Sequence, residues 1–220
     1  MIVTIDGPAG AGKSSVARAL AERLGFQFLD TGATYRAVAW KCLQEGVDIQ
    51  NAAQAARVAS SIQIRLEGNR VFVDNIDVTE AIRSPEVSSA ASVVAAHEGV
   101  RTKLVDLQRR LAAGRNIVTE GRDQGTVVFP NAECKFFLTA SAEERARRRL
   151  RDLQKAGHSE SSFKQVLADI QERDARDAQR AVSPLRPAPD AVVVDTTHLT
   201  QQQVIEQLWQ HVKNKQASTK

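Results

Sequence analysis

Residues 7–14 constrain the fold of this chain more than any other stretch, because they match the phosphate-binding pattern G-x-x-x-x-G-K-[ST]. The β-branched run 2–5 precedes the pattern and predicts a buried strand, and the helical spacing of apolar residues in 16–24 predicts a helix after it. A glycine-rich turn that only joined a strand to a helix would require neither the lysine nor the hydroxyl. The sequence therefore predicts a strand, a phosphate-binding loop and a helix, in that order.

In a loop of this kind the backbone N–H groups and the helix N-terminus point at an anion. Lys13 is expected to reach the β- and γ-phosphates of a nucleoside triphosphate, and to face solvent before the nucleotide binds. Ser14 is expected to offer its hydroxyl to Mg²⁺, because this metal prefers oxygen ligands. The residues expected to hold the nucleotide are Gly7, Pro8, Ala9, Gly10, Ala11, Gly12, Lys13, Ser14 and Ser15.

Length and charge limit the remaining possibilities. With 220 residues and 42% hydrophobic content, the chain can bury one good core, so we expect one main domain with insertions. The net charge of +4 fits a protein that handles small anions better than one that coats nucleic acid. Cys42 and Cys134 lack metal-binding spacing and indicate core residues of a reducing compartment. No apolar run reaches membrane-spanning length, so we expect a cytoplasmic protein without membrane partners. We also expect a monomer without nucleic-acid partners.

The first half of the chain then alternates between helical and extended patterns. Residues 26–30 predict a second strand, and 33–60 predict two helices separated near 46–50. Residues 62–73 alternate with period two around a turn and predict a β-hairpin, with 76–78 as a possible third strand. Because this hairpin interrupts a βαβ-like chain, we expect it to be a small insert. Helices are expected from Pro85 and over about 98–113.

The second half carries two arginine-rich patterns. Gly121-Arg122-Asp123 follows a predicted strand at 116–120, so it lies at the edge where parallel strands place ligands. There Arg122 could hold a phosphate, or it could form an ordinary salt bridge. After a strand at 135–139, Ser141 begins a predicted capping box and a helix with arginines at 145, 147, 148, 149 and 151.

Arg173, Arg176, Asp177 and Arg180 recur at helical spacing in a predicted helix over about 161–178. Like charges at this spacing repel, so the stripe indicates a compensating anion, although a solvated face would use the same residues. A proline-rich stretch at 183–189 follows, then a predicted buried strand at 191–195 and a helix to about 212. We expect the polar tail 213–220 to be disordered.

Four motifs together resemble those of bacterial cytidylate kinases, over nearly the whole chain. They are IDGPAGAGK at 5–13, DTGATYR at 30–36, GRDQGTVVFP at 121–130 and ERDARD at 172–177. The hairpin matches the β insert that distinguishes these enzymes from shorter nucleoside monophosphate kinases. The resemblance implies an α/β fold with a P-loop NTPase-like parallel sheet flanked by helices, a small antiparallel β insert and a helical lid. It also implies transfer of the γ-phosphate of ATP to CMP or dCMP, with Mg²⁺, in pyrimidine nucleotide metabolism.

The resemblance also implies roles for matching residues. Lys13, Arg122 and Arg176 would act in catalysis, with Arg176 and arginines of the 145–149 run in a lid over ATP. The residues that it assigns to the acceptor nucleotide are Thr31, Arg36, Ser92, Arg101, Arg122, Asp123, Arg173, Asp177 and Arg180. Among these, Arg36, Arg122 and Arg180 would hold the phosphate, Ser92, Arg101 and Asp123 the cytosine, and Arg173 and Asp177 the sugar. Gln124 stands where the family usually has an apolar residue.

The expected organisation is one P-loop kinase domain over 1–220. Within it, 33–113 would form the helices that bind the nucleoside monophosphate, with the β insert at about 62–78, and the lid would span about 143–182. Two other classes share part of the sequence pattern. A kinase for a non-nucleotide acceptor, of shikimate or dephospho-coenzyme A type, would share the loop but would not need the motifs at 121–130 and 172–177. An RNA-binding module would use the basic patches for a polyanionic backbone.

Overall fold

The computed structural model describes residues 1–155 and 161–218. The chain divides into two compact units, Met1–Leu29 with Gly114–Lys220, and Asp30–Ala113. Each unit is built on its own hydrophobic cluster.

The main sheet has five strands in the order β2-β6-β1-β7-β8. Its strands are β1 Ile2–Asp6, β2 Gln27–Asp30, β6 Ile117–Gly121, β7 Cys134–Thr139 and β8 Val192–Asp195. Strand β1 pairs in parallel with β6 and β7, and β8 pairs in parallel with β7. The register places Asp6 opposite Gly121, so the loops that follow β1 and β6 leave the same edge of the sheet. This parallel α/β arrangement confirms the fold class that the sequence predicts.

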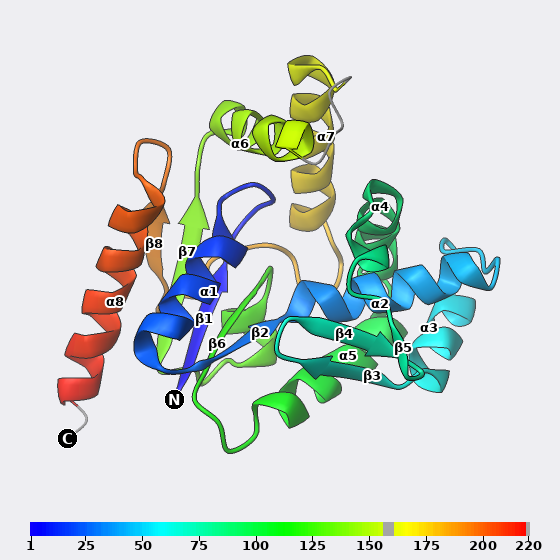
Figure 1. Cartoon of the computed structure of the whole chain (residues 1–220), viewed down its shortest axis with the longest axis horizontal. Helices are drawn as coiled ribbons and strands as arrows, with labels where there is room; N and C mark the ends of the chain where they lie inside the picture. Colours follow the sequence, from blue (N-terminus) through cyan, green and yellow to red (C-terminus); the bar gives the residue numbers. More distant parts are fainter. Residues whose placement is uncertain (156–160, 219–220) are drawn as a thin grey trace. The chain divides into compact units, whose positions relative to one another are not determined.

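Helices α1 Lys13–Leu24 and α8 Gln201–Ser218 cover a face of this sheet (Figure 1). The apolar side chains that join them to the strands include Ile5, Leu20, Phe136 and Leu208, all buried. Helix α1 ends at Gly25, whose φ of 69° is left-handed, as expected for a glycine that closes a helix.

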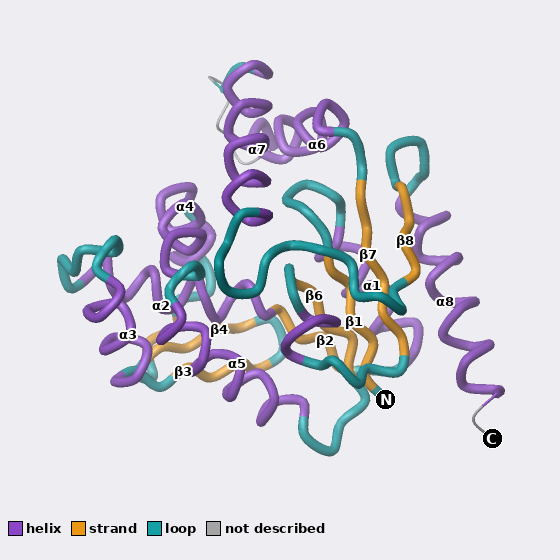
Figure 2. Tube along the Cα trace, turned by 180° about the vertical axis from the view of Figure 1, so that it is seen from behind, coloured by secondary structure: helices purple, strands orange, loops and turns teal. Residues whose placement is uncertain are grey.

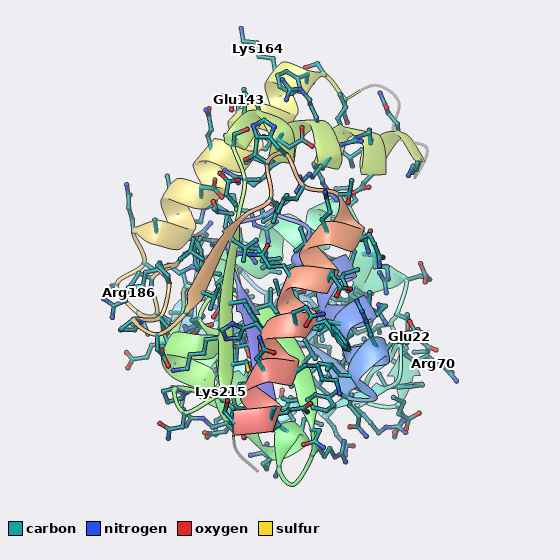
Figure 3. The ribbon with its side chains drawn as sticks, turned by 90° about the vertical axis from the view of Figure 1, so that its left-hand side faces the viewer. Glu22, Arg70, Glu143, Lys164, Arg186 and Lys215 are labelled. Atoms are coloured by element: carbon teal, nitrogen blue, oxygen red, sulfur yellow. The ribbon has the colours of Figure 1, made fainter. Side chains whose placement is uncertain are left out.

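Helices α6 Ala142–Lys155 and α7 Phe163–Ala178 belong to the same unit and lie side by side (Figures 1 and 2). Ala146 of α6 packs with Val166 and Ile170 of α7 in a small apolar cluster. Glu143 and Lys164 lie on the outer side of this pair, where both are exposed (Figure 3). The amphipathic pattern therefore leaves charged faces on both helices and buries one narrow stripe.

The second unit holds the helices and the insert that the sequence predicts. Its helices are α2 Thr31–Gln44, α3 Ala52–Ser61, α4 Pro85–Val94 and α5 Glu98–Ala112, with a 3₁₀ turn at Ala81–Arg83. Strands β3 Ile64–Glu67, β4 Arg70–Val73 and β5 Ile76–Asp77 form an antiparallel sheet of three strands. Ser84 caps α4 by accepting a hydrogen bond from the N–H of Val87, with Pro85 at the first helical position.

Three local expectations are wrong. Helix α8 continues to Ser218 instead of ending near 212, because Val212 is buried and the following residues favour helix; residues 219–220 lie outside the described residues. Strand β8 is an edge strand whose Val193 is 57% exposed, so it is not fully buried. Ser141 accepts from the N–H of Glu144, but the Glu144 carboxylate pairs with arginines of α6 instead of completing a capping box.

Within residues 1–155 and 161–218, no helix combines the length and the apolar character needed to cross a membrane.

Candidate active site

The loop between β1 and α1 has the close backbone packing that its glycines predict. Gly7 adopts φ 145°, and a Cβ at this position would lie 2.0 Å from the carbonyl oxygen of Leu138 on β7. At Gly10, with φ 77°, a Cβ would lie 3.0 Å from Cβ of Arg145. Side chains at these two positions would push the loop off the sheet edge and off α6, so the loop can keep this shape only with glycine.

Lys13 differs from expectation, because it does not face solvent. Its side chain is 5% exposed, and Nζ donates a hydrogen bond to the carbonyl oxygen of Pro8 at 2.8 Å. Burial, followed by the positive charge of Arg122, lowers the pKa of Lys13 to about 7, although Glu120 acts in the opposite direction. Burial is favoured here because the loop folds over the lysine's methylene groups and gives its ammonium group one carbonyl oxygen.

Ser14 provides the test of whether the loop fits Mg²⁺. Its Oγ donates to Oε1 of Glu120 at 2.8 Å, so a hydroxyl from the first turn of α1 and a carboxylate from β6 lie together. Both are hard oxygen donors of the kind that bind Mg²⁺ alongside substrate phosphates. Within the described ranges, no cluster of three or more His, Cys, Asp and Glu side chains could hold a metal without such phosphates. The site therefore fits a metal that arrives with a nucleotide.

The loop after β6 carries Arg122 and Asp123 and leads into a π-helical turn, Gln124–Val128, which the sequence did not predict. Arg122 donates from Nε to Oδ2 of Asp177 at 2.8 Å, and from Nη1 to the carbonyl oxygen of Gly121 at 3.2 Å. Asp123 is 3% exposed. The structure thus joins the motif at 121–130 to the motif at 172–177 through a buried ion pair.

Asp177 is the centre of an arginine cluster, which we define as Arg122, Arg173 and Arg180. Its side chain is 1% exposed and is bonded by both Arg122 and Arg180. Burial opposes the charge of Asp177, but Arg122 and Arg180 lower its pKa below the usual value. Burial and the positive charge of Arg122 lower the pKa of Arg173 to about 10. Three guanidinium groups around one carboxylate leave an excess of positive charge suited to an anion.

Arg176 lies apart from this cluster, although the spacing placed it on one stripe with Arg173 and Arg180. Its Nη2 bonds to Oε1 of Glu172 at 2.5 Å, and its side chain is 35% exposed. The stripe therefore divides between residues near Asp177 and a residue that pairs with Glu172 at the surface.

Arg145 in α6 bonds to oxygen atoms of the protein. It is buried, its Nε donates to the carbonyl oxygen of Ala140 at 2.9 Å, and its Nη1 donates to that of Ala9 at 3.1 Å. Its Nη2 lies 2.6 Å from Oδ2 of Asp174 in α7. Arg145 thereby connects the glycine loop with α6 and α7.

Arg148 is held in a similar way, by Glu144 and by the hydroxyl and carbonyl oxygens of Thr196 at 3.0 and 2.6 Å. Arg147 and Arg151 are exposed and pair with Glu144. Arg149 is exposed, and it makes no hydrogen bond or ion pair with any residue in the part of the chain that the structure describes.

The second unit holds four of the predicted acceptor residues. Asp30 caps α2 through the N–H of Ala33 and also bonds to Nη2 of Arg36, both at 2.9 Å. Thr31, Ser92 and Arg101 are buried. The guanidinium of Arg101 lies 5.6 Å from the ring centre of Tyr35, within the range of a cation–π contact.

Sequence reasoning assigned no individual role in this site to Asp6, Glu120, Arg145 or Thr196, although Arg145 belongs to the 145–149 run that the resemblance places in a lid. Asp6 and Glu120 could have been found, because each stands at the carboxyl end of a strand beside the glycine loop. Thr196 has no such signal, since it reaches the loop only through the pairing of β8 with β7.

Comparison with known sequences gives one consistent result. The family model described as cytidylate kinase matches residues 3–214. The chain is 51% identical over 209 residues to a cytidylate kinase of Desulfitobacterium hafniense (strain Y51), which covers 94% of this chain and 90% of that protein. It is 48% identical over 218 residues to a cytidylate kinase of Vibrio cholerae, with 97% and 96% covered.

Solved structures give a more distant likeness. A shikimate kinase from Bacteroides thetaiotaomicron superposes with a TM-score of 0.50 at 14% identity, covering 97% of both chains. A gluconokinase from Sinorhizobium meliloti gives 0.50 at 17% identity, covering 96% of this chain and 91% of that one. At this identity the likeness supports the P-loop kinase fold alone.

Proposed function

The chain belongs to the cytidylate kinase family and transfers the γ-phosphate of ATP to CMP or dCMP, and we propose that its glycine loop and its arginine cluster carry out this transfer. The observation that carries the assignment is the placement of two anion-binding features at one sheet edge. The glycine loop follows β1, and Arg122 of the cluster follows the adjacent strand β6. A kinase that joins two phosphates needs such a pair of sites.

On the ATP side, the backbone of 7–14 and the N-terminus of α1 bind phosphate oxygens. Lys13 gives up its bond to Pro8 and donates to the β- and γ-phosphates. A bound phosphate restores the charge that burial disfavours in the unliganded enzyme. Ser14, oriented by Glu120, would hold Mg²⁺, which when bound neutralises charge on the phosphates.

On the acceptor side, Arg122 and Arg180 bind the phosphate of CMP, while Arg173 and Asp177 face its sugar. The acceptor oxygen is already anionic, so the reaction needs no general base. The obstacle is repulsion between two polyanions, and the surplus positive charge of the cluster offsets it. Arg36 and Thr31 of the second unit add contacts to the phosphate.

Ser92, Arg101 and Asp123 read the base. Cytosine presents an exocyclic amino group where uracil has a carbonyl oxygen, so a carboxylate attracts the first and repels the second. Asp123 is our candidate for that carboxylate.

In the proposed lid, Arg149 and Arg176 bind ATP. Arg145 and Arg148 already bond to the protein's own oxygen atoms, whereas the exposed Arg149 has no such bond within the described ranges. Closure over ATP also has to exclude water, since water would otherwise accept the phosphate. We further propose that the enzyme acts as a cytoplasmic monomer.

A panel of CMP, dCMP and UMP with Mg-ATP, followed by ADP release, tests this function. We expect CMP to exceed UMP by at least about tenfold in kcat/KM, because one hydrogen-bonding contact discriminates by ~1–3 kcal/mol. Asp123→Asn should erode the preference, because an amide can present either a donor or an acceptor. If the ratio of kcat/KM for CMP to that for UMP is unchanged in this variant, Ser92 and Arg101 recognise the base instead of Asp123. No phosphorylation of CMP or dCMP by the wild type would contradict the function itself.

A further inference from the structure

We propose that Asp6 is a positioning residue for the loop that presents Arg122 and Asp123, although in sequence it stands directly before the ATP-binding loop. The proposal rests on the acceptor-side roles given above for Arg122 and Asp123. It assigns Asp6 to recognition of CMP, not of ATP.

Both carboxylate oxygens of Asp6 bond to the loop after β6. Oδ1 accepts from the backbone N–H of Gln124 and Oδ2 from that of Gly125, each at 2.8 Å. These two residues begin the π-helical turn Gln124–Val128, so their N–H groups belong to the first turn of a helix and need acceptors from outside it. The Asp6 side chain is 3% exposed, so water cannot replace these acceptors easily.

Asp6 takes a capping role that Asp123 would fill in an ordinary helix. Asp123 occupies the N-cap position, where an aspartate usually accepts from the N–H groups of the first turn. Its side chain makes no such bond, and Asp6 on the neighbouring strand accepts from Gln124 and Gly125 instead. Asp6 therefore caps the turn that begins directly after Arg122 and Asp123, and it fixes the backbone that carries both side chains.

Close packing restricts the same loop as well. A Cβ on Gly125 would lie 3.0 Å from Oγ1 of Thr4, 3.2 Å from Cδ of Lys135 and 3.4 Å from Oδ2 of Asp6. The buried Gln124 side chain accepts from Oγ1 of Thr119 at 3.1 Å. The loop therefore sits on the strand end with little room to move while the Asp6 bonds are intact.

A charged carboxylate at the buried position of Asp6 costs free energy, which is consistent with a specific role for this residue. Burial and the nearby negative charge of Asp123 raise its pKa, whereas the two backbone N–H groups and Lys13 lower it; the balance is about 6. Arg122 is also close enough to interact with this carboxylate. An apolar residue would avoid the cost but would leave two N–H groups of the loop without an acceptor.

The experiment compares Asp6→Asn with wild type in the full chain, varying CMP and ATP separately. An amide has one oxygen and must turn its NH₂ group toward one of the two N–H donors, so the loop loses a bond and gains a repulsion. We expect kcat/KM for CMP to fall by about tenfold or more and KM for ATP to stay within about twofold. A rise in KM for ATP with unchanged use of CMP would overturn the proposal, since it would mean that Asp6 acts through Lys13.

Thr4→Val is the matched control. Thr4 lies two residues before Asp6 on β1, is fully buried, and its Oγ1 has no hydrogen-bond partner in the described part of the chain. This variant should leave both kinetic constants unchanged. If Asp6→Asn fails to fold, Gly125→Ala gives the second test, because the added methyl must displace the loop from Asp6 without altering any charge. The same split between CMP and ATP is expected there, and its absence would contradict the proposal.

A double-mutant cycle with Asp123→Ala separates this inference from the proposed function. If Asp6 acts by positioning Asp123, the two losses in CMP use should be less than additive. Fully additive losses would overturn positioning through Asp123. If Asp123→Ala alone has no effect while Asp6→Asn still impairs CMP, the base-reading role fails and positioning of Arg122 by Asp6 stands.

Discussion

The arginines of α6 and the arginines around Asp177 belong to the same unit but differ in what they contact. Arg145 and Arg148 bond to carbonyl, hydroxyl and carboxylate oxygens of the protein. In the cluster, Arg122 and Arg180 bond to Asp177, and the pKa of Arg173 is lowered because burial and the neighbouring arginines disfavour its charge. We propose that these arginines are of two kinds, those that bond only to other groups of the protein and those that also bind the substrate.

Lys13 belongs to the second kind, so Lys13→Ala should break catalysis more than any other single change. We expect turnover to fall by on the order of 10²-fold or more, because the ammonium group stabilises charge that develops during transfer. Thermal stability should be unchanged or higher, since a buried cation with a lowered pKa is removed. Steady-state kinetics with a melting curve measure both, and turnover within a few-fold of wild type in the folded variant would contradict the role of the glycine loop.

Arg145 belongs to the first kind, so Arg145→Ala should act on stability. The change leaves the Asp174 carboxylate without its cation and two carbonyl oxygens without their donor, which should cost about 2–4 kcal/mol in the free energy of unfolding. Arg147→Ala is the control, because Arg147 is 61% exposed and its ion pair is worth at most about 1 kcal/mol. Denaturant unfolding measures the free energy of unfolding of both variants. Equal values would contradict the structural role of Arg145.

The smallest expected effect concerns protons. Burial lowers the pKa of Lys13 to about 7, and bound phosphate should raise it again, so ATP binding near pH 8 should take up a fraction of a proton. ATP affinity should accordingly decrease as pH rises above about 7. In the unliganded enzyme, the unfolded chain binds more protons at Lys13 than the folded chain between the folded pKa of about 7 and the ordinary lysine pKa of 10.5, so this group adds stability as pH rises. Calorimetry in two buffers of different ionisation enthalpy measures the uptake, and identical heats would contradict it.

The sequence predicts the parts of the molecule whose geometry is local. The strand, loop and helix around Gly7 and Lys13 follow from glycine spacing and helical periodicity, and the hairpin at β3 and β4 follows from its alternation. The placement of Gly121 at the active edge follows from the general rule for parallel sheets.

Features that depend on contacts between distant segments could not be predicted. The stripe of Arg173, Arg176 and Arg180 has one helical spacing, yet only tertiary packing decides that Arg176 faces Glu172 and solvent. The burial of Lys13 depends on the fold of its own loop, and the bonds of Asp6 depend on the register of β1 with β6. Helix α8 extends because Val212 packs into a core that the tail's polar composition does not reveal.

Arg173→Ala gives the most direct test of the claim that the cluster is kept for substrate. Arg173 is partly buried, and its Nε is shielded from solvent and has no hydrogen-bond partner among residues 1–155 and 161–218. Melting temperature and kcat/KM for CMP should be measured on this one variant. We predict an equal or higher melting temperature together with a loss of about tenfold or more in kcat/KM, because a partly buried, repelled charge and the proposed contact with the sugar disappear at once. A lower melting temperature with unchanged kcat/KM would show that Arg173 serves the fold, and would contradict the account.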